Sequence, residues 1–241
     1  MDLLPTPPGW DYAERLAEVR ERADAACAAA GRNTGEVQLL VATKNFDADA
    51  AVAVVKAGGL LIGESTAQEI AVKADPVRAA GAHMHFIGHL QRNKANYVID
   101  LVDCVESVAT IELAERLDRV AAMRERTLDV MVQVNVSGEE TKGGFALWEA
   151  ADAAAQVAAL EHLTVTGFMT IGANSRNEAE VRDGYSALRD LRDTVKLWGG
   201  ADLARAHHLS MGMSSDLEWA IAEGATIVRV GSAIMGERTQ A

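Results

Sequence analysis

"QLLVATKNFDADAAVAVVKAGG", from Gln38 to Gly59, joins an apolar run to a second run rich in alanine and valine. The first run, Leu39–Thr43, has the composition of a buried strand and ends directly at Lys44. The second, Asp47–Ala57, is typical of a helix, and a glycine pair follows it. A strand followed at once by a helix is the building unit of parallel α/β sheets. A lysine at that point either extends into solvent or serves as a nucleophilic amine.

The same alternation of strand-like and helix-like runs continues through the rest of the sequence. Strands are expected at eight places: Val37–Thr43, Leu60–Gly63, His83–Ile87, Leu101–Val105, Leu128–Val134, Leu163–Phe168, Ala206–Leu209 and Thr226–Val230. Helices are expected between them and also before the first strand, at Asp11–Ala30, Asp47–Ala57, Ser65–Ala74, Gln91–Tyr97, Ala109–Arg124, Leu147–Ala158, Glu178–Leu197 and Ser214–Glu223. Eight strands alternating with helices favour a single (β/α)8 TIM barrel with an extra N-terminal helix. An open doubly wound sheet is the alternative, although no GxGxxG follows the first strand.

Length and composition are typical of one globular domain. The 241 residues predict a single domain, 1–241, of which residues 1–10 form a flexible N-terminal arm. The net charge of −12 argues against a nucleic-acid surface, which needs a basic patch. Neither a signal-peptide pattern nor an apolar run long enough to span a membrane is present, so a cytoplasmic protein is expected. Cys27 and Cys104 fit buried thiols in a reducing compartment.

The loops after the seventh and eighth strands carry small polar residues suited to an anion. The first of them, "LSMGMSSD", supplies the hydroxyls of Ser210 and Ser214 and the close backbone approach allowed by Gly212. The second supplies Gly231 and Ser232 directly after the last strand. Loops after strands seven and eight form the phosphate site of many barrels. Each residue alone also fits an ordinary cap or turn, but together they favour a phosphate site.

A phosphate site there lies next to Lys44, because the first and last strands of a closed barrel are neighbours. An amine beside a phosphate suits pyridoxal 5'-phosphate (PLP) held as a Schiff base, and equally a Schiff-base aldolase acting on a sugar phosphate. Arg229, two residues before Gly231, could donate a hydrogen bond to a pyridine nitrogen and keep it unprotonated. A structural ion pair of Arg229 with Glu64 or Glu106 is the competing interpretation.

No metal site is expected. His83, His85 and His89 form an H-x-H-x₃-H run, but no carboxylate or cysteine stands at a familiar ligand spacing from them. Packing in a strand and its following loop explains them better. No serine, histidine and aspartate arrangement supports nucleophilic catalysis either.

Seven stretches resemble the PLP homeostasis proteins, also called proline synthetase co-transcribed homologues. They are "LVATK" (40–44), "GES-AQE" (63–69), "HFIGHLQRNK" (85–94), "VQVNVSGEETKGG" (132–144), "GFMTIG" (167–172), "LSMGMSSDLEWAI" (209–221) and "VRVGSAIMGER" (228–238). The resemblance covers nearly the whole chain and implies a barrel similar to the N-terminal domain of alanine racemase. It also implies that Lys44 carries the cofactor.

The family pattern assigns roles to further positions. It implies that Ser210, Met211, Gly212, Gly231 and Ser232 surround the phosphate, with Ser214 in the same loop, and that Arg229 faces the pyridine nitrogen. Two positions depart from the pattern. Ser65 and Thr66 stand where the family commonly has an asparagine and an aromatic residue, and Thr43 replaces a serine while keeping the hydroxyl.

Two classes of function follow. The first is a PLP-binding protein of intracellular PLP homeostasis without substantial catalysis, expected to be a monomer, with PLP-dependent apo-enzymes as candidate partners. The second is a PLP-dependent amino-acid racemase or lyase. Racemisation needs an acid or base on each face of the substrate, and the alanine racemases take a tyrosine from a second domain. Tyr12, Tyr97 and Tyr185 all lie in expected helices, which favours binding and leaves trace racemase activity open.

Overall fold

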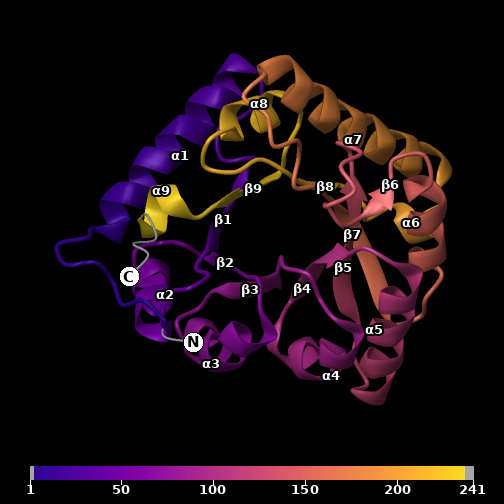
Figure 1. Ribbon diagram of the computed structural model, residues 1–241, viewed down its shortest axis with the longest axis horizontal. Helices are drawn as coiled ribbons and strands as arrows, with labels where there is room; N and C mark the ends of the chain where they lie inside the picture. Colours follow the sequence, from indigo (N-terminus) through magenta and orange to yellow (C-terminus); the bar gives the residue numbers. More distant parts are fainter. Residues whose placement is uncertain (1–2, 237–241) are drawn as a thin grey trace.

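A closed barrel of parallel strands forms the centre of the molecule, surrounded by a ring of helices (Figure 1). The computed structural model describes residues 3–236. Its barrel strands are β1 (Gln38–Ala42), β2 (Leu61–Glu64), β3 (His83–Phe86), β4 (Cys104–Val108), β5 (Leu128–Asn135), β7 (Leu163–Met169), β8 (His208–Ser210) and β9 (Ile227–Val230). Neighbours pair in the order β4-β3-β2-β1-β9-β8-β7-β5, and pairing of β4 with β5 closes the barrel. The predicted (β/α)8 architecture is confirmed.

Helices follow the strands and cover the outside of the barrel. They are α1 (Tyr12–Ala29), α2 (Ala48–Lys56), α3 (Ala67–Ala79), α4 (Ala95–Val98), α5 (Ile111–Met123), α6 (Ala150–Ala158), α7 (Glu178–Trp198), α8 (Leu217–Ala222) and α9 (Ser232–Met235). Short 3₁₀ turns lie at Arg92–Lys94, Ile99–Leu101 and Ala201–Leu203. The expected extra N-terminal helix is α1, which lies beside α8 and α9 where the last strand returns to the first (Figure 1). No helix within residues 3–236 combines the length and the apolar character needed to cross a membrane.

Because successive side chains of a strand point to opposite faces, the barrel strands contribute to two separate cores. Outward residues such as Val41 and Val228 join the large core between barrel and helices. A smaller core fills the barrel interior, built from Leu40, Leu61, Cys104, Met131, Met169 and Ile227. Polar side chains occupy the remaining inward positions toward the carboxyl ends of the strands. Arg229 is one of these, two residues beyond Ile227 and in register with Leu40 of β1.

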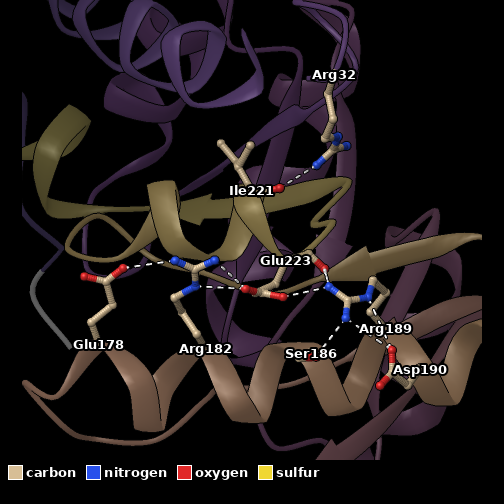
Figure 2. A network of polar contacts seen from close by, with 8 residues as sticks. All are labelled: Arg32, Glu178, Arg182, Ser186, Arg189, Asp190, Ile221 and Glu223. Atoms are coloured by element: carbon tan, nitrogen blue, oxygen red, sulfur yellow. Dashed lines mark hydrogen bonds and ion pairs between the residues drawn. The ribbon is translucent and has the colours of Figure 1, made fainter. Parts of the chain in front are cut away.

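An ion-pair network holds the segment that leads into β9. Glu223, just after α8, accepts hydrogen bonds from Arg182 and Arg189 of α7 at 2.8 and 2.7 Å (Figure 2). Arg32, beyond α1, donates to the carbonyls of Ile221 and Ala225, each at 2.9 Å. Three arginines, two from α7 and one from the loop after α1, therefore fix the end of α8, from which the chain enters the strand that carries Arg229.

Some boundaries differ from the expected ones. The fourth strand is Cys104–Val108 instead of Leu101–Val105, because the chain first makes a 3₁₀ turn at Ile99–Leu101. Glu106, expected in a loop, therefore lies within a strand and is fully buried. Helix α8 begins at Leu217 instead of Ser214, and the short strand β6 (Phe145–Ala146) and helix α9 were not predicted.

The N-terminal arm was expected to be flexible, and this stays a prediction. In its described part, Leu4 donates from its backbone N–H to the carbonyl of Asn45 at 2.7 Å. The Leu4 carbonyl accepts from Asp47 at 2.8 Å, and the indole of Trp10 donates to the carbonyl of Ile234 at 2.7 Å. The arm thus contacts the segment directly after Lys44.

Candidate functional site

A cavity of about 650 Å³ lies at the carboxyl ends of the barrel strands. Its polar lining comes from Lys44 after β1, Arg229 and Gly231 at the end of β9, Ser232 of α9 and the Ser214–Ser215 pair after β8. Apolar side chains complete the wall: Ala42, Phe46, Ile87, Ile171, Met213 and Met235. Residues more than 180 positions apart in the chain thus share one cavity, because β1 and β9 are adjacent strands.

Lys44 occupies a tight turn between β1 and α2. The N–H of Phe46 donates to the carbonyl of Thr43 at 3.1 Å, and Asn45 has a φ of +72°. Positive φ at the third position is the signature of a type II turn, and asparagine tolerates it better than most residues. Lys44 is therefore the second residue of the turn. This places a half-buried ammonium group on the wall of the cavity.

Arg229 is held by bonds at two of its N–H groups. Nη1 donates to the hydroxyl of Ser210 at 2.8 Å, and Nη2 donates to the carbonyl of Thr170 at 2.6 Å. The side chain is only 7% exposed, and burial lowers the pKa of its guanidinium, an effect opposed by the carboxylate of Glu106. A guanidinium has five N–H donors, so the two bonds fix its orientation and leave further donors on a group that lines the cavity.

Glu106 supplies the negative charge behind Arg229. Its Oε2 accepts from Ser210 at 2.5 Å, and its Oε1 lies 2.7 Å from Nδ1 of His85. Burial acts to raise the pKa of Glu106, but the hydrogen bond and charge of His85, the charge of Arg229 and the bond from Ser210 outweigh it and lower the pKa. The carboxylate therefore stays ionised inside the barrel. Arg229 and Glu106 are thus linked through the hydroxyl of Ser210, and not by the direct ion pair that the competing interpretation of the sequence expected.

The expected phosphate residues fall into two groups. Ser214, Gly231 and Ser232 line the cavity. Ser210, Met211 and Gly212 are buried, and the described lining does not include them. Gly212 has a φ of +88°, and a Cβ at this position would lie 2.4 Å from that of Ala220, so glycine lets the loop approach α8. That any of these residues contacts a phosphate stays a prediction.

Tyr185 reaches this end of the barrel from α7, although it follows no strand. Its hydroxyl donates to Asp216 Oδ2 at 2.8 Å, and the other oxygen of Asp216 accepts from the N–H of Met213 at 2.6 Å. The ring is fully buried, and burial followed by the charge of Asp216 strongly raises the pKa of the phenol. Tyr185 thus supports the loop after β8, and it is absent from the described cavity lining.

His85 and His208 have side-chain partners within the barrel, Glu106 and Thr226. His85 bonds Glu106, and burial, followed by the charges of His207 and His85, lowers the pKa of His208 to about 4. Within residues 3–236, no group of three or more histidine, cysteine or carboxylate side chains is placed to hold a metal ion.

A second set of buried charges lies behind Lys44, and it was not expected from the sequence. Lys73 of α3 is fully buried and donates to Glu64 Oε1 at 2.7 Å, and Glu69 of the same helix is 1% exposed. The pattern of helix α3 could have indicated that these two charged residues are buried. Glu69 and Lys73 fall on the same stripe of α3 as the buried Ile70, Ala74 and Val77.

The residues present suit a planar phosphorylated aldehyde. A primary amine can bond the aldehyde carbon, serine hydroxyls can donate to phosphate oxygens, a guanidinium can face a ring nitrogen, and Phe46, Ile87 and Ile171 can cover an aromatic ring. A second cavity of about 710 Å³ adjoins the first and shares Ile171, Met213 and Ser215 with it.

Comparison with known proteins identifies the family. Residues 16–239 match the family described as "Alanine racemase, N-terminal domain". The PLP homeostasis protein of Aquifex aeolicus is 37% identical over 225 residues, which cover 93% of this chain and 97% of that protein.

Solved structures agree with this assignment. An unknown protein from Bifidobacterium adolescentis is 41% identical, with a TM-score of 0.89 over 92% of this chain and 94% of its own. PipY of Synechococcus elongatus, solved with PLP bound, is 31% identical, with a TM-score of 0.80 over 94% of this chain and all of its own. The predicted resemblance is confirmed: the chain belongs to the alanine racemase N-terminal domain family and, within it, to the pyridoxal phosphate homeostasis proteins.

Proposed function

We propose that this protein binds PLP in the cavity at the carboxyl ends of the strands, as a Schiff base on Lys44, and serves intracellular PLP homeostasis without substantial turnover. The observation that carries the proposal is that Lys44 and Arg229 line one cavity from adjacent strands. The PLP-bound structure of PipY supports the choice of cofactor. A cytoplasmic monomer that exchanges PLP with PLP-dependent apo-enzymes is part of the same proposal.

Lys44 supplies the covalent attachment. Its neutral amine would attack the aldehyde carbon, and the aldehyde oxygen would leave as water with both amine hydrogens as the carbon–nitrogen double bond forms. The turn that holds Lys44 keeps the amine on the cavity wall, while the apolar side chains of Phe46 and Ile87 limit access of water to the bond.

Arg229 and the serines orient the bound cofactor. Ser214 and Ser232 present hydroxyls to the cavity, and each charge-assisted bond to a phosphate oxygen adds about 1.5–3 kcal/mol. Arg229, fixed by Ser210 and Thr170, presents an always-charged donor to the pyridine nitrogen. Bound PLP is an electron sink that strengthens when its ring nitrogen is protonated, and Arg229 opposes that protonation.

The same lining favours binding over racemisation. Lys44 could serve one face of a substrate, but the described cavity lining holds no tyrosine for the other face. Tyr185, which supports the loop after β8, has its hydroxyl bonded to Asp216. A racemase or lyase acting on amino acids remains the alternative, and the names of the curated relatives describe homeostasis instead.

The visible absorption spectrum of the purified protein tests this proposal. Addition of PLP is expected to give a yellow species that borohydride bleaches, and Lys44→Ala is expected to abolish the bleachable species. Lys196→Ala, an exposed lysine on α7, is the matched control and should behave as wild type. A protein that stays colourless with PLP would support the cofactor-free aldolase instead.

A further inference from the structure

Buried charged groups hold both peptide groups that flank Lys44. On one side, the ammonium of Lys73 donates to the carbonyl of Thr43 at 2.9 Å. On the other side, Glu69 Oε1 accepts from the backbone N–H of Asn45 at 2.6 Å. Lys44 is the residue between these two contacts. Its backbone is therefore fixed from behind, from the side of α3, while its side chain lines the cavity.

Glu64 at the end of β2 contacts both partners of the Lys73–Thr43 bond, and its carboxyl interacts with that of Glu69. Its Oε1 accepts from Lys73 at 2.7 Å and from the hydroxyl of Thr43. Glu64, Glu69 and Lys73, here called the Lys44 clamp, are each at most 1% exposed. Thr43 thus receives two contacts from the clamp, one at its carbonyl and one at its hydroxyl.

Burying the three charged groups of the clamp is not an efficient way to stabilise a fold. Moving an ammonium and carboxylates out of water is unfavourable, and apolar side chains of the same volume often stabilise a fold equally well. Glu64 Oε2 and Glu69 Oε2 are buried without a hydrogen-bond partner. With both acids ionised the cluster would carry a net charge of −1, so a single proton shared by the two carboxyls would make it neutral and satisfy one of these oxygens.

The polar atoms of the clamp are directed at the turn that carries Lys44. That turn contains a non-glycine residue in the left-handed region, Asn45 at φ +72°, a conformation that asparagine tolerates but does not prefer, so contacts on both sides help to hold it. We propose that Glu64, Glu69 and Lys73 are positioning residues that enforce this turn and thereby keep the Lys44 amine where it can attack a carbonyl in the cavity. The inference rests on the proposed function only in taking PLP as the carbonyl compound. The placement of Lys44 by the clamp does not depend on that function.

The test compares Lys73→Met and Glu69→Met with wild type. Lys73→Met removes the donor to Thr43, and Glu69→Met removes the acceptor for Asn45. Glu64→Gln is the conservative variant, since its amide oxygen can still accept from Lys73 while its NH₂ replaces the shared proton. Lys196→Met is the control for loss of an exposed lysine.

Two measurements read the position of Lys44. In the protein freed of cofactor, competitive labelling with acetic anhydride and mass spectrometry gives the reactivity of Lys44 relative to exposed Lys56. Separate titrations compare PLP with pyridoxine 5'-phosphate, which has no aldehyde and cannot bond the amine. Displacement of a reacting group by about 1 Å can cost roughly a hundredfold in rate.

We expect both methionine variants to change the relative labelling of Lys44 by roughly tenfold and to weaken PLP, while pyridoxine 5'-phosphate binds within about twofold of wild type. Glu64→Gln and Lys196→Met should match wild type. Unchanged labelling in the folded methionine variants, or equal losses of both ligands, would overturn the inference. If wild type binds no PLP the proposed function fails, yet labelling still tests the clamp. If one methionine variant does not fold, the other decides.

Discussion

Arg229 of β9 donates a hydrogen bond to the hydroxyl of Ser210 of β8 at 2.8 Å, and this hydroxyl donates in turn to Glu106 of β4 at 2.5 Å. The serine hydroxyl therefore bridges a buried guanidinium and a buried carboxylate, and the three residues come from three different strands. This relationship explains how an always-charged side chain is tolerated inside a barrel otherwise filled by Leu40, Met131 and Ile227. It also gives Ser210 a contact that competes with a direct role at a phosphate.

Loss of the buried Glu106 carboxylate should destabilise the folded protein. Glu106→Gln leaves Arg229 without its compensating charge, so we expect the free energy of unfolding to fall by about 3 kcal/mol. Urea denaturation measures the change. Glu115→Gln, which breaks the exposed 3.8 Å pair with Arg119, is the matched control and should cost less than about 0.5 kcal/mol. Equal effects of the two substitutions would show that Glu106 does not stabilise Arg229.

Ser232 and Ser210 are the two serines whose loss tests the position of the phosphate. Ser232→Ala removes a hydroxyl on the cavity wall and should weaken binding by about ten- to a hundredfold. Because the covalent bond to Lys44 can hide part of this loss, the dissociation rate should be measured together with equilibrium occupancy. Ser210→Ala should weaken binding to a similar degree if its hydroxyl also reaches the phosphate. Unchanged retention in the double variant would place the phosphate elsewhere.

The Lys44 clamp predicts a specific pH dependence of stability. Burial, opposed by the charge of Lys73, raises the pKa of Glu64 to about 7 from an ordinary value of 4.5. The folded protein therefore holds this proton more tightly than the unfolded chain does. The contribution of Glu64 to stability is complete below the ordinary pKa and is lost as the pH rises through about 7.

Glu64→Gln has no proton to lose at this position. From about pH 5 to about pH 8, the variant should gain stability relative to wild type by on the order of 2 kcal/mol. The difference in unfolding free energy between the two proteins, measured across this range, isolates Glu64 because other groups titrate in both. A difference that does not change with pH would mean that Glu64 is ionised in the folded protein throughout.

Turnover of amino acids should be absent or slow. Incubation of the PLP-loaded protein with a panel of L-amino acids in deuterated water should leave chirality and deuterium content unchanged, because no second acid or base faces Lys44 in the described lining. Chiral chromatography and mass spectrometry detect either product. Enzyme-like turnover that disappears in Lys44→Ala would place the racemase alternative first.

Local sequence patterns predicted the strands well and their exact ends less well. The run Leu39–Thr43 and its seven counterparts are apolar enough to identify buried strands, and their alternation with helices predicts parallel pairing. The fourth strand shifted by three residues because Asp100 and Leu101 fold into a 3₁₀ turn, a local choice that apolar content does not reveal. That shift moved Glu106 from an expected loop into the barrel interior.

Residue type and loop position predicted part of the cavity lining. Lys44, Ser214, Arg229, Gly231 and Ser232 meet there, because adjacency of the first and last strands follows from closure. The direction of a hydroxyl such as that of Ser210 depends on which partners lie across the barrel, and linear sequence does not specify them. The partners of Lys73 likewise depend on how α3 packs behind β1 and β2.

Peptide mapping after borohydride reduction shows whether Lys44 carries the cofactor. The protein loaded with PLP is reduced, which converts the carbon–nitrogen double bond into a stable secondary amine, then digested and sequenced by mass spectrometry. We predict a phosphopyridoxyl group on Lys44 and none in Lys44→Ala. An adduct mapped instead to Lys94, Lys142 or Lys73, at comparable occupancy in wild type and Lys44→Ala, would show that another lysine carries the cofactor.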